Sequence, residues 1–271
     1  GIGLIRAELM MLDCFEGESP LTIVQQRSPQ GFVDRLATQI EQFAQAVYPR
    51  PTLYRSLDWR SHEFTQWRQA DDPPESNPML GLRGTFRYQI HPTLFDLELQ
   101  ALYQVCQRGS SNLRLLLPFV RTVAEVEFCV QRLTDLGLSR LTDFELWMMA
   151  EVPSVLFQLP QYVQAGIQGI AIGTSDLTQL LLGVDRDHPQ LSTHFTATDP
   201  AVKAAIAQLI QTARSLNIPC SICGHILSDD AEFVEFVVQA GVTAIAVERD
   251  GLARTRRAIA QAEQRLGLAN G

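Results

Sequence analysis

The segments ELWMMAEVPS (residues 145–154) and GIAIGTSD (residues 169–176) decide the fold. Each begins with a short apolar run and ends in polar residues that include a carboxylate. Apolar runs that do not alternate with polar residues predict strands buried on both faces, which is typical of parallel sheets. The intervening Pro153–Gln164 has the apolar spacing of a helix. The two segments therefore predict a strand–helix–strand unit with parallel strands.

The same alternation runs through the rest of the chain. We predict eight strands, at Ile2–Ile5, Thr52–Ser56, a short run ending near Leu82, Leu113–Phe119, Glu145–Ala150, Gly169–Ile172, Pro219–Ile222 and Thr243–Val247. Helical patterns are clearest at Phe32–Val47, Pro92–Gln107, Val123–Leu136, Pro153–Gln164, Ala201–Leu216, Asp230–Ala240 and Leu252–Leu266. Helix starts are predicted at Asp199-Pro200 and Ser228–Asp230, and helix stops at Gly137, Gly166 and Gly241. Eight units in 271 residues favour the α/β class, as a single (β/α)₈ TIM barrel over residues 1–271, over a doubly wound open sheet.

The composition of the chain argues against several classes of function and location. The chain has 22 Lys and Arg against 30 Asp and Glu, a net charge of −8, which argues against a non-specific nucleic-acid partner. No apolar run reaches the roughly 18 residues of a membrane span, and no signal peptide is recognisable. Five cysteines, an odd number, predict reduced thiols and a cytoplasmic location. The chain begins within apparent structure, so we expect a fragment of a longer protein.

The predicted strands deliver polar residues at their carboxyl ends, where α/β barrels hold their active sites. These residues are Arg6, Arg55, Arg83, Glu151, the run Gly173–Asp176, Cys223 and Glu248. Arginine binds phosphate and carboxylate oxygens with fixed fork donors, so three arginines predict an anionic, phosphorylated substrate. Any one of them alone would more often be a surface residue or part of a structural ion pair.

Two carboxylates at neighbouring strand ends suggest a metal site. Glu151 and Asp176 are hard oxygen donors, with no histidine beside either, and would suit Mg²⁺ or Mn²⁺. The alternative for Asp176 is a helix N-cap ahead of Leu177.

The pair Cys220 and Cys223 lacks the further ligands of a zinc site. Strand alternation points the two thiols to opposite faces, which predicts Cys220 in the core and Cys223 at the barrel mouth. There Cys223 could serve as an acid or nucleophile, and a small buried side chain is the alternative. His62 and His225 are expected to be polar loop residues. The long connections 58–78 and 177–199 are predicted to be lids or oligomer contacts.

Six motifs together resemble one family. They are GIGLIRAE (1–8), YRSLD (54–58), NPMLGLRG (77–84), MAEVPS (149–154), IGTSDLTQ (172–179) and ICG (222–224). In this order they are similar to the C-terminal phosphoenolpyruvate/pyruvate-binding barrel of the PEP-utilising enzymes. Within that family the stretch RSLDWRSHEF (55–64) is most similar to the phosphoenolpyruvate synthases and lacks the Gly-Gly-Asp-Lys run expected of enzyme I of the sugar phosphotransferase system.

The resemblance implies a role for each matching residue. Arg6 and Arg55 would hold the phosphoryl group, with Arg83 completing the cationic wall. Glu151 and Asp176 would bind Mg²⁺, with Mn²⁺ as a substitute. Gly173, Thr174, Ser175 and Asp176 would contact substrate, and Cys223 would move a proton on or off its methyl carbon.

The implied reaction transfers a phosphoryl group from a phosphohistidine to pyruvate enolate, giving phosphoenolpyruvate. The whole enzyme would convert ATP, pyruvate and water to AMP, phosphoenolpyruvate and phosphate, in the direction of gluconeogenesis. The nucleotide-binding and phosphohistidine domains do not resemble any part of this chain, so the phosphohistidine domain of the same full-length enzyme is the expected partner. A homodimer is also expected, with no nucleic acid or membrane partner.

Three positions depart from the family pattern. Ser175 stands where Asn is usual, His225 where Gln or Glu is usual, and Glu248 where small or neutral polar residues are usual. A carboxylate near an anionic substrate is repulsive unless a cation pairs it. The alternatives are therefore the barrel of a pyruvate phosphate dikinase or of enzyme I, or a domain that senses phosphoenolpyruvate without turnover.

Overall fold

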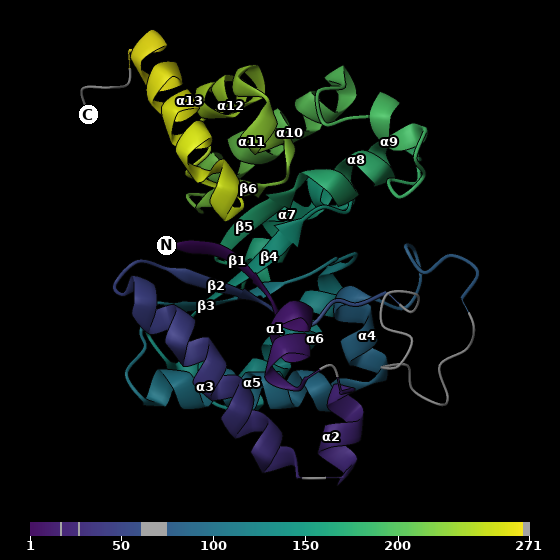
Figure 1. The fold of residues 1–271 in the computed structure, drawn as a ribbon, viewed down its shortest axis with the longest axis vertical. Helices are drawn as coiled ribbons and strands as arrows, with labels where there is room; N and C mark the ends of the chain where they lie inside the picture. Colours follow the sequence, from purple (N-terminus) through teal and green to yellow (C-terminus); the bar gives the residue numbers. More distant parts are fainter. Residues whose placement is uncertain (17, 27, 61–74, 268–271) are drawn as a thin grey trace. The chain divides into compact units, whose positions relative to one another are not determined.

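A computed structural model of the chain describes residues 1–16, 18–26, 28–60 and 75–267. Parallel strands alternate with helices along the sequence (Figure 1). The chain divides into two compact units, one of Gly1–Met148 with Ala165–Ile167 and one of Met149–Gln164 with Gln168–Gly271.

The strands of the first unit are paired in chain order and in parallel. They are β1 (Ile2–Arg6), β2 (Thr52–Arg55), β3 (Leu113–Leu117) and β4 (Glu145–Ala150), whose last two residues belong to the second unit. Arg6 is the register partner of Arg55, and Arg55 is the register partner of Leu116. The register therefore sets Arg6 and Arg55 side by side at the carboxyl edge of this ladder.

Helices fill the connections of the first unit: α1 (Ala7–Cys14), α2 (Pro20–Gln26), α3 (Pro29–Val47), α4 (Gly84–Ile90), α5 (Pro92–Gln107), α6 (Val123–Asp135) and the 3₁₀ turn η2 (Leu138–Arg140). Helix α3 begins where the Ser28 hydroxyl accepts a hydrogen bond from the Gly31 N–H, with Pro29 as its first residue. Its apolar side chains recur at helical spacing and are buried, and the helix packs against α5 (Figure 1).

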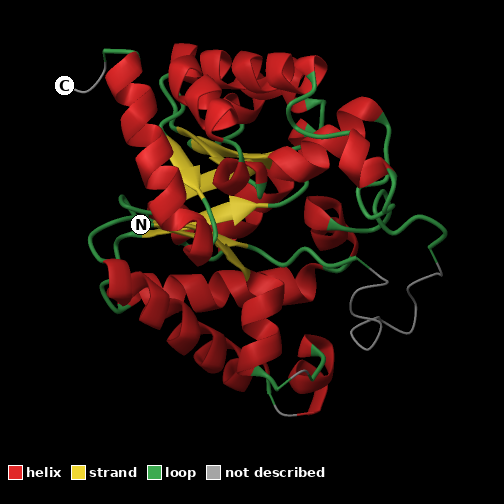
Figure 2. Ribbon diagram, turned by 45° about the horizontal axis from the view of Figure 1, so that its top comes forward, coloured by secondary structure: helices red, strands yellow, loops and turns green. Residues whose placement is uncertain are grey.

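The second unit continues the same pattern with β5 (Gly169–Gly173), β6 (Cys220–Cys223) and β7 (Ala244–Ala246), again parallel and in chain order. Gly173 is the register partner of Cys223. The helices of this unit, red in Figure 2, are α7 (Val155–Gln164), α8 (Thr174–Leu182), α9 (Leu191–His194), α10 (Pro200–Ser215), α11 (Ile226–Asp229), α12 (Ala231–Ala240), η3 (Arg249–Gly251) and α13 (Leu252–Arg265).

Parallel strands in chain order with helical connections confirm the predicted α/β barrel class. The strands number seven among the described residues, because the predicted short strand ending near Leu82 is wrong. Residues 75–83 form turns instead, closed by hydrogen bonds from Leu80 N–H to the Asn77 carbonyl and from Arg83 N–H to the Gly81 carbonyl. Pro78 and Gly81 favour turns over a ladder, which explains the difference. The rest of the predicted connection, residues 61–74, lies outside the described residues.

The predicted helix punctuation is confirmed. The carboxylates of Asp199 and Asp230 cap α10 and α12 by accepting N–H hydrogen bonds. Gly137, Gly166 and Gly241 all have positive φ, the conformation that ends helices most readily at glycine. Helices α1, α2, α4, α8, α9 and α11 were not predicted. None of the helices that the structure describes is long and apolar enough to cross a membrane.

Candidate active site

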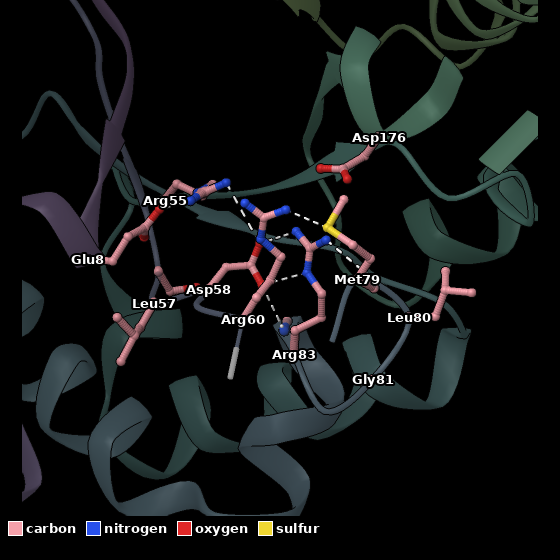
Figure 3. A network of polar contacts seen from close by, with 12 residues as sticks. Glu8, Arg55, Leu57, Asp58, Arg60, Met79, Leu80, Gly81, Arg83 and Asp176 are labelled. Carbon is pink, nitrogen blue, oxygen red and sulfur yellow. Dashed lines mark hydrogen bonds and ion pairs between the residues drawn. The ribbon is translucent and has the colours of Figure 1, made fainter. Parts of the chain in front are cut away.

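Arg55, the last residue of β2, begins a cluster of charged side chains in the first unit (Figure 3). Its guanidinium forms a buried ion pair with Glu8 of α1 and lies 3.8 Å from an Asp58 carboxylate oxygen. Only 9% of the Arg55 surface is exposed. Its register partner Arg6 is exposed and directly precedes α1. The predicted arginines at these two strand ends therefore lie together.

Arg83 reaches the same cluster from the residue before α4. Its Nε and Nη2 atoms donate to the two oxygens of Asp58 at 3.1 and 2.7 Å, a bidentate pair. The Gly84 N–H donates to Asp58 Oδ1 at 3.0 Å. Burial by itself raises the pKa of Asp58, but the charge and hydrogen bonds of Arg83, with help from Arg55, outweigh burial and hold this pKa well below its usual value. Asp58 is thus a permanent anion that bridges both arginines (Figure 3).

Gly84 allows the start of α4 to lie close to Pro118 and Phe119. Gly84 has φ of +60°, and a Cβ at this position would lie 2.7 Å from Phe119 Cβ and 2.8 Å from the Pro118 carbonyl oxygen. Helix α4 therefore starts directly against the residues that follow β3. The Arg83 guanidinium in turn lies 3.9 Å from the centre of the Phe119 ring.

Three charged residues of this cluster were not predicted. Glu8 and Asp58 are the counter-charges of the arginines, and Arg121 donates to the carbonyl oxygens of Arg83 and Gly81 at 3.1 and 2.8 Å. Burial raises the pKa of Glu8, and the charge of Arg55 opposes only part of that rise. One signal in the sequence was available: a carboxylate follows both strand-end arginines within three residues, Glu8 after Arg6 and Asp58 after Arg55.

In the second unit Glu151 directly follows β4 and is almost fully buried, with 2% of its surface exposed. Its carboxylate rests on the backbone of Gly173 at the end of β5. A Cβ at residue 173 would collide with Glu151 Oε2 and lie 2.8 Å from Met149 Cε. Gly173 therefore leaves space for the Glu151 carboxylate beside this strand end.

Asp176 lies in the first turn of α8, which begins at Thr174 with Gly173 at the N-cap position. The alternative interpretation of Asp176 as the N-cap is therefore wrong. Its carboxylate is buried and forms an ion pair with Arg186 at 3.3 Å. The first N–H groups of a helix lack intrahelical acceptors and carry partial positive charge, so residues 174–176 offer a site for an anionic group.

Cys223, the last residue of β6, is half-buried. Its thiol lies 3.5 Å from the Ile172 carbonyl oxygen and donates to it, and Thr174 Oγ1 donates to the Cys223 carbonyl at 3.2 Å. Gly224 has φ of +147°, and a Cβ there would collide with Thr174 Oγ1. The Thr174 hydroxyl thus joins the ends of β5 and β6 by a hydrogen bond, and Gly224 leaves the space that this hydroxyl occupies.

Cys220 is in the core, as predicted, and burial raises the pKa of its thiol to about 12. Its Sγ faces the Ser221 carbonyl, so the two thiols of β6 use different acceptors. All five cysteines lie within the described residues and are free thiols.

The three departures from the family pattern lie on the surface. Ser175, His225 and Glu248 are exposed, and Glu248 accepts a hydrogen bond from Gly251 N–H through its backbone carbonyl. His62 lies outside the described residues.

Among the residues that the structure describes, no group of three or more His, Cys, Asp and Glu side chains is arranged to hold a metal. Glu151 and Asp176 are two buried carboxylates of the second unit. Mg²⁺ is commonly bound by one or two carboxylates, with water and substrate oxygens completing its octahedron. The donor chemistry fits Mg²⁺ or Mn²⁺ and lacks the nitrogen or sulfur ligands that zinc prefers.

The parallel α/β barrel carries a cluster of charged side chains around buried arginines in its first unit, and buried carboxylates and a thiol near strand ends in its second unit. The model of the family described as "PEP-utilising enzyme, PEP-binding domain" matches residues 1–264. The chain belongs to this family.

Curated relatives carry names from one branch of the family. The chain is 40% identical to the "Probable phosphoenolpyruvate synthase" of Staphylothermus marinus, with 99% of the chain and 33% of the relative covered. It is 39% identical to the "Phosphoenolpyruvate synthase" of Aeropyrum pernix, again with 99% and 33% covered. The relative of that name from Pyrococcus furiosus is 33% identical, with 98% and 32% covered. The chain therefore spans about a third of the length of these relatives.

Proposed function

We propose that the chain is the catalytic barrel of a phosphoenolpyruvate synthase, which makes phosphoenolpyruvate from pyruvate and a phosphohistidine. The names of the relatives support this proposal, as does the resemblance of the strand-end motifs. The observation that carries it is the charge arrangement. Buried Arg55 ends β2 and buried Arg83 precedes α4 in the first unit, while in the second unit two buried carboxylates and a half-buried thiol follow or end strands.

The arginines would bind the phosphoryl group. Arg55 and Arg83 are held by Glu8 and Asp58, so their guanidinium groups are oriented before any substrate arrives. Preorganised donors stabilise charge in a transition state without a reorganisation cost during the reaction. Arg6 is exposed and adds a third positive charge at the same edge of the sheet. Together they would stabilise the equatorial oxygens of the transferring group.

Glu151 and Asp176 would hold Mg²⁺, or Mn²⁺ in its place. A metal ion bound there would supply Lewis-acid stabilisation of the enolate. Gly173 keeps the Glu151 carboxylate at the strand end, and the exposed N–H groups of residues 174–176 would bind the carboxylate of the substrate.

Cys223 would move the proton at the methyl carbon. Its thiol lies 3.5 Å from the Ile172 carbonyl oxygen, beside the end of β5. In the synthetic direction the Cys223 thiolate would take a proton from the methyl group of pyruvate, and the enolate oxygen would attack phosphorus. The O–P bond forms as the bond from phosphorus to the histidine nitrogen breaks. In the reverse direction Cys223 would return a proton to the methylene carbon of phosphoenolpyruvate.

The chain covers about a third of the length of its relatives, so the remaining steps of the reaction are assigned to other domains of a longer protein. We infer that the ATP-dependent phosphorylation of a histidine occurs on another domain, and that AMP and phosphate are released there. A homodimer, a role in gluconeogenesis and a cytoplasmic location are part of the same proposal. The five free thiols support a reducing compartment.

The test is phosphoenolpyruvate formation by the full-length protein from ATP and pyruvate with Mg²⁺, followed by ³¹P NMR. Glu151→Gln should reduce the rate on the order of 10³-fold, because the metal loses one of two protein ligands. Glu145→Gln is a matched control at the opposite end of β4, where Glu145 pairs with Arg114 at 2.8 Å, and it should keep wild-type activity. A wild-type protein that binds phosphoenolpyruvate but forms none would show instead the sensing domain considered above.

A further inference from the structure

A buried polar cluster packs around the segment that carries Arg55. We call it the Glu98 cluster, and it consists of Tyr54, Ser56, Leu57, Tyr88 and Glu98. Glu98 lies on α5 and has 0% of its surface exposed. Its Oε1 atom accepts hydrogen bonds from the Tyr54 hydroxyl at 2.8 Å and from the Leu57 N–H at 3.0 Å. One carboxyl oxygen thus holds residues on both sides of Arg55.

A second helix holds the same segment. The Tyr88 hydroxyl of α4 donates to the Leu57 carbonyl at 2.7 Å and lies 2.9 Å from Ser56 Oγ. The Tyr88 ring stacks on Phe95 of α5, with ring centres 4.3 Å apart. Helix α4 also begins at Gly84, whose N–H holds Asp58. Residues 54–58 are therefore fixed by side chains and backbone from both α4 and α5.

Burying a carboxyl group in the core destabilises the folded state unless hydrogen bonds offset its loss of hydration. The other oxygen, Glu98 Oε2, is buried and has no hydrogen-bond partner among the described residues. Burial raises the pKa of Glu98 to about 8, so the side chain is a neutral acid at pH 7. An apolar residue would avoid this cost but could not accept from Tyr54 and Leu57.

We propose that Glu98 is a positioning residue for phosphoryl binding, which fixes residues 54–58 and thereby orients Arg55 and, through Asp58, Arg83. The proposal rests on the proposed function of these two arginines. Glu98 accepts its hydrogen bonds from Tyr54 and Leu57, which lie on either side of Arg55 in the sequence. The geometric part of its effect reaches the substrate through the backbone that it holds.

The neutral state of Glu98 matters for the same reason. The groups that face it are Tyr54 of β2, Tyr88 and Arg87 of α4, and His91, which follows α4; Glu8 and Arg55 act on it through their charges. Ionisation of Glu98 would add a negative charge behind the phosphoryl-binding arginines. We therefore expect the affinity for an anionic substrate to weaken as the pH rises through about 8.

The experiment measures KM and kcat for phosphoenolpyruvate in the pyruvate-forming direction, with the full-length protein from pH 6.5 to 9. Glu98→Leu removes the acceptor and should raise KM about tenfold, with kcat falling less than about threefold. Tyr88→Phe keeps the Phe95 contact and should raise KM about threefold. Glu98→Gln keeps the accepting oxygen and should restore the wild-type KM at pH 7, without the alkaline rise in KM.

The outcomes separate this inference from the function on which it rests. Wild-type KM in both Glu98→Leu and Tyr88→Phe would overturn the positioning role, and an alkaline rise retained in Glu98→Gln would overturn the role of its charge. If Glu98→Leu does not fold, Tyr88→Phe and Glu98→Gln still decide. Arg55→Ala is the reference: if it leaves phosphoenolpyruvate binding unchanged, the proposed phosphoryl site is wrong, whatever the Glu98 variants show.

Discussion

The two units place opposite charges at their strand ends by different means. In the first unit the arginines are held by side chains, since Arg55 pairs with Glu8 and Arg83 pairs with Asp58. In the second unit the carboxylate of Glu151 is set by close backbone approach, which Gly173 permits. Gly224 plays the same part beside Thr174.

This difference follows from what each set would bind. An anion site needs fixed donors, and buried guanidinium groups need counter-charges to be stable without a ligand. A metal site needs carboxylate oxygens that can reach a cation, and Gly173 leaves space for the Glu151 carboxylate beside the end of β5. Asp176 is intermediate, because it pairs with Arg186.

The largest effect should come from removing the side-chain ion pair that holds Arg83, and it should appear in the stability of the protein. Asp58→Ala leaves the bidentate donors of Arg83 without an acceptor in a buried site, which should cost about 3–5 kcal/mol of unfolding free energy. Urea unfolding followed by tryptophan fluorescence measures this loss. Asp143→Ala, at an exposed position, should change stability by less than about 0.5 kcal/mol. Equal effects of the two substitutions would show that the buried bridge does not stabilise the first unit.

The next largest effect should come from filling the space that Gly224 leaves beside Thr174, and it should appear in kcat. Gly224→Ala forces a Cβ against Thr174 Oγ1 and displaces the Cys223 strand end, so kcat should fall about 10²-fold. Gly183→Ala is the matched control, because Gly183 also has positive φ but would place its Cβ with no atom within 4 Å. It should cost about 1 kcal/mol of stability and leave kcat within a factor of three. Similar losses of kcat in both variants would implicate backbone strain alone.

A smaller effect concerns pH. The pKa of Glu98 is raised by burial from 4.5 to about 8, so the folded state keeps a proton that the unfolded state releases over that range. Stability should therefore fall as pH rises from about 4.5 to about 8, by up to about 1.4 kcal/mol per pH unit from this group. Glu98→Gln should lose that slope in urea unfolding, whereas exposed Glu127→Gln should keep it. Parallel curves for Glu98→Gln and wild type would refute a neutral Glu98.

The smallest effect should be at Asp176. Arg186→Gln removes a cation that competes for the carboxylate, and since this pair is partly exposed the gain is about 1 kcal/mol or less. Mn²⁺ affinity, measured by electron paramagnetic resonance, should rise up to about fivefold. Weaker Mn²⁺ binding in this variant would mean that Arg186 supports the metal site.

Local sequence patterns predicted most of the fold because strands buried on both faces and helix caps are local features. Glu145–Ala150 and Pro92–Gln107 have the predicted bounds. The predicted strand ending near Leu82 was wrong because three apolar residues there resemble a strand, whereas Pro78 and Gly81 favour the turns that the structure shows.

The candidate site was predicted less completely. Arg6 and Arg55 lie side by side as predicted, because neighbouring parallel strands end at one edge of the sheet, and the roles of the arginines and carboxylates stay predictions. Partners such as Glu98 could not be predicted, since Glu98 holds Tyr54 across 44 residues of sequence and lies inside an ordinary helical pattern. Counter-charges and hydrogen-bond partners depend on packing, which local patterns do not specify.

The most direct test of the account is deuterium exchange into the methyl group of pyruvate, followed by ¹H NMR in D₂O with the full-length protein and Mg²⁺. The account predicts exchange in the wild type, lost in Cys223→Ala and in Glu151→Gln, with Glu145→Gln unchanged. Binding of pyruvate, measured alongside, shows that the site is occupied. Exchange that persists in Cys223→Ala, or a wild type that binds pyruvate without exchange, would contradict the assignment of Cys223 as the acid–base residue.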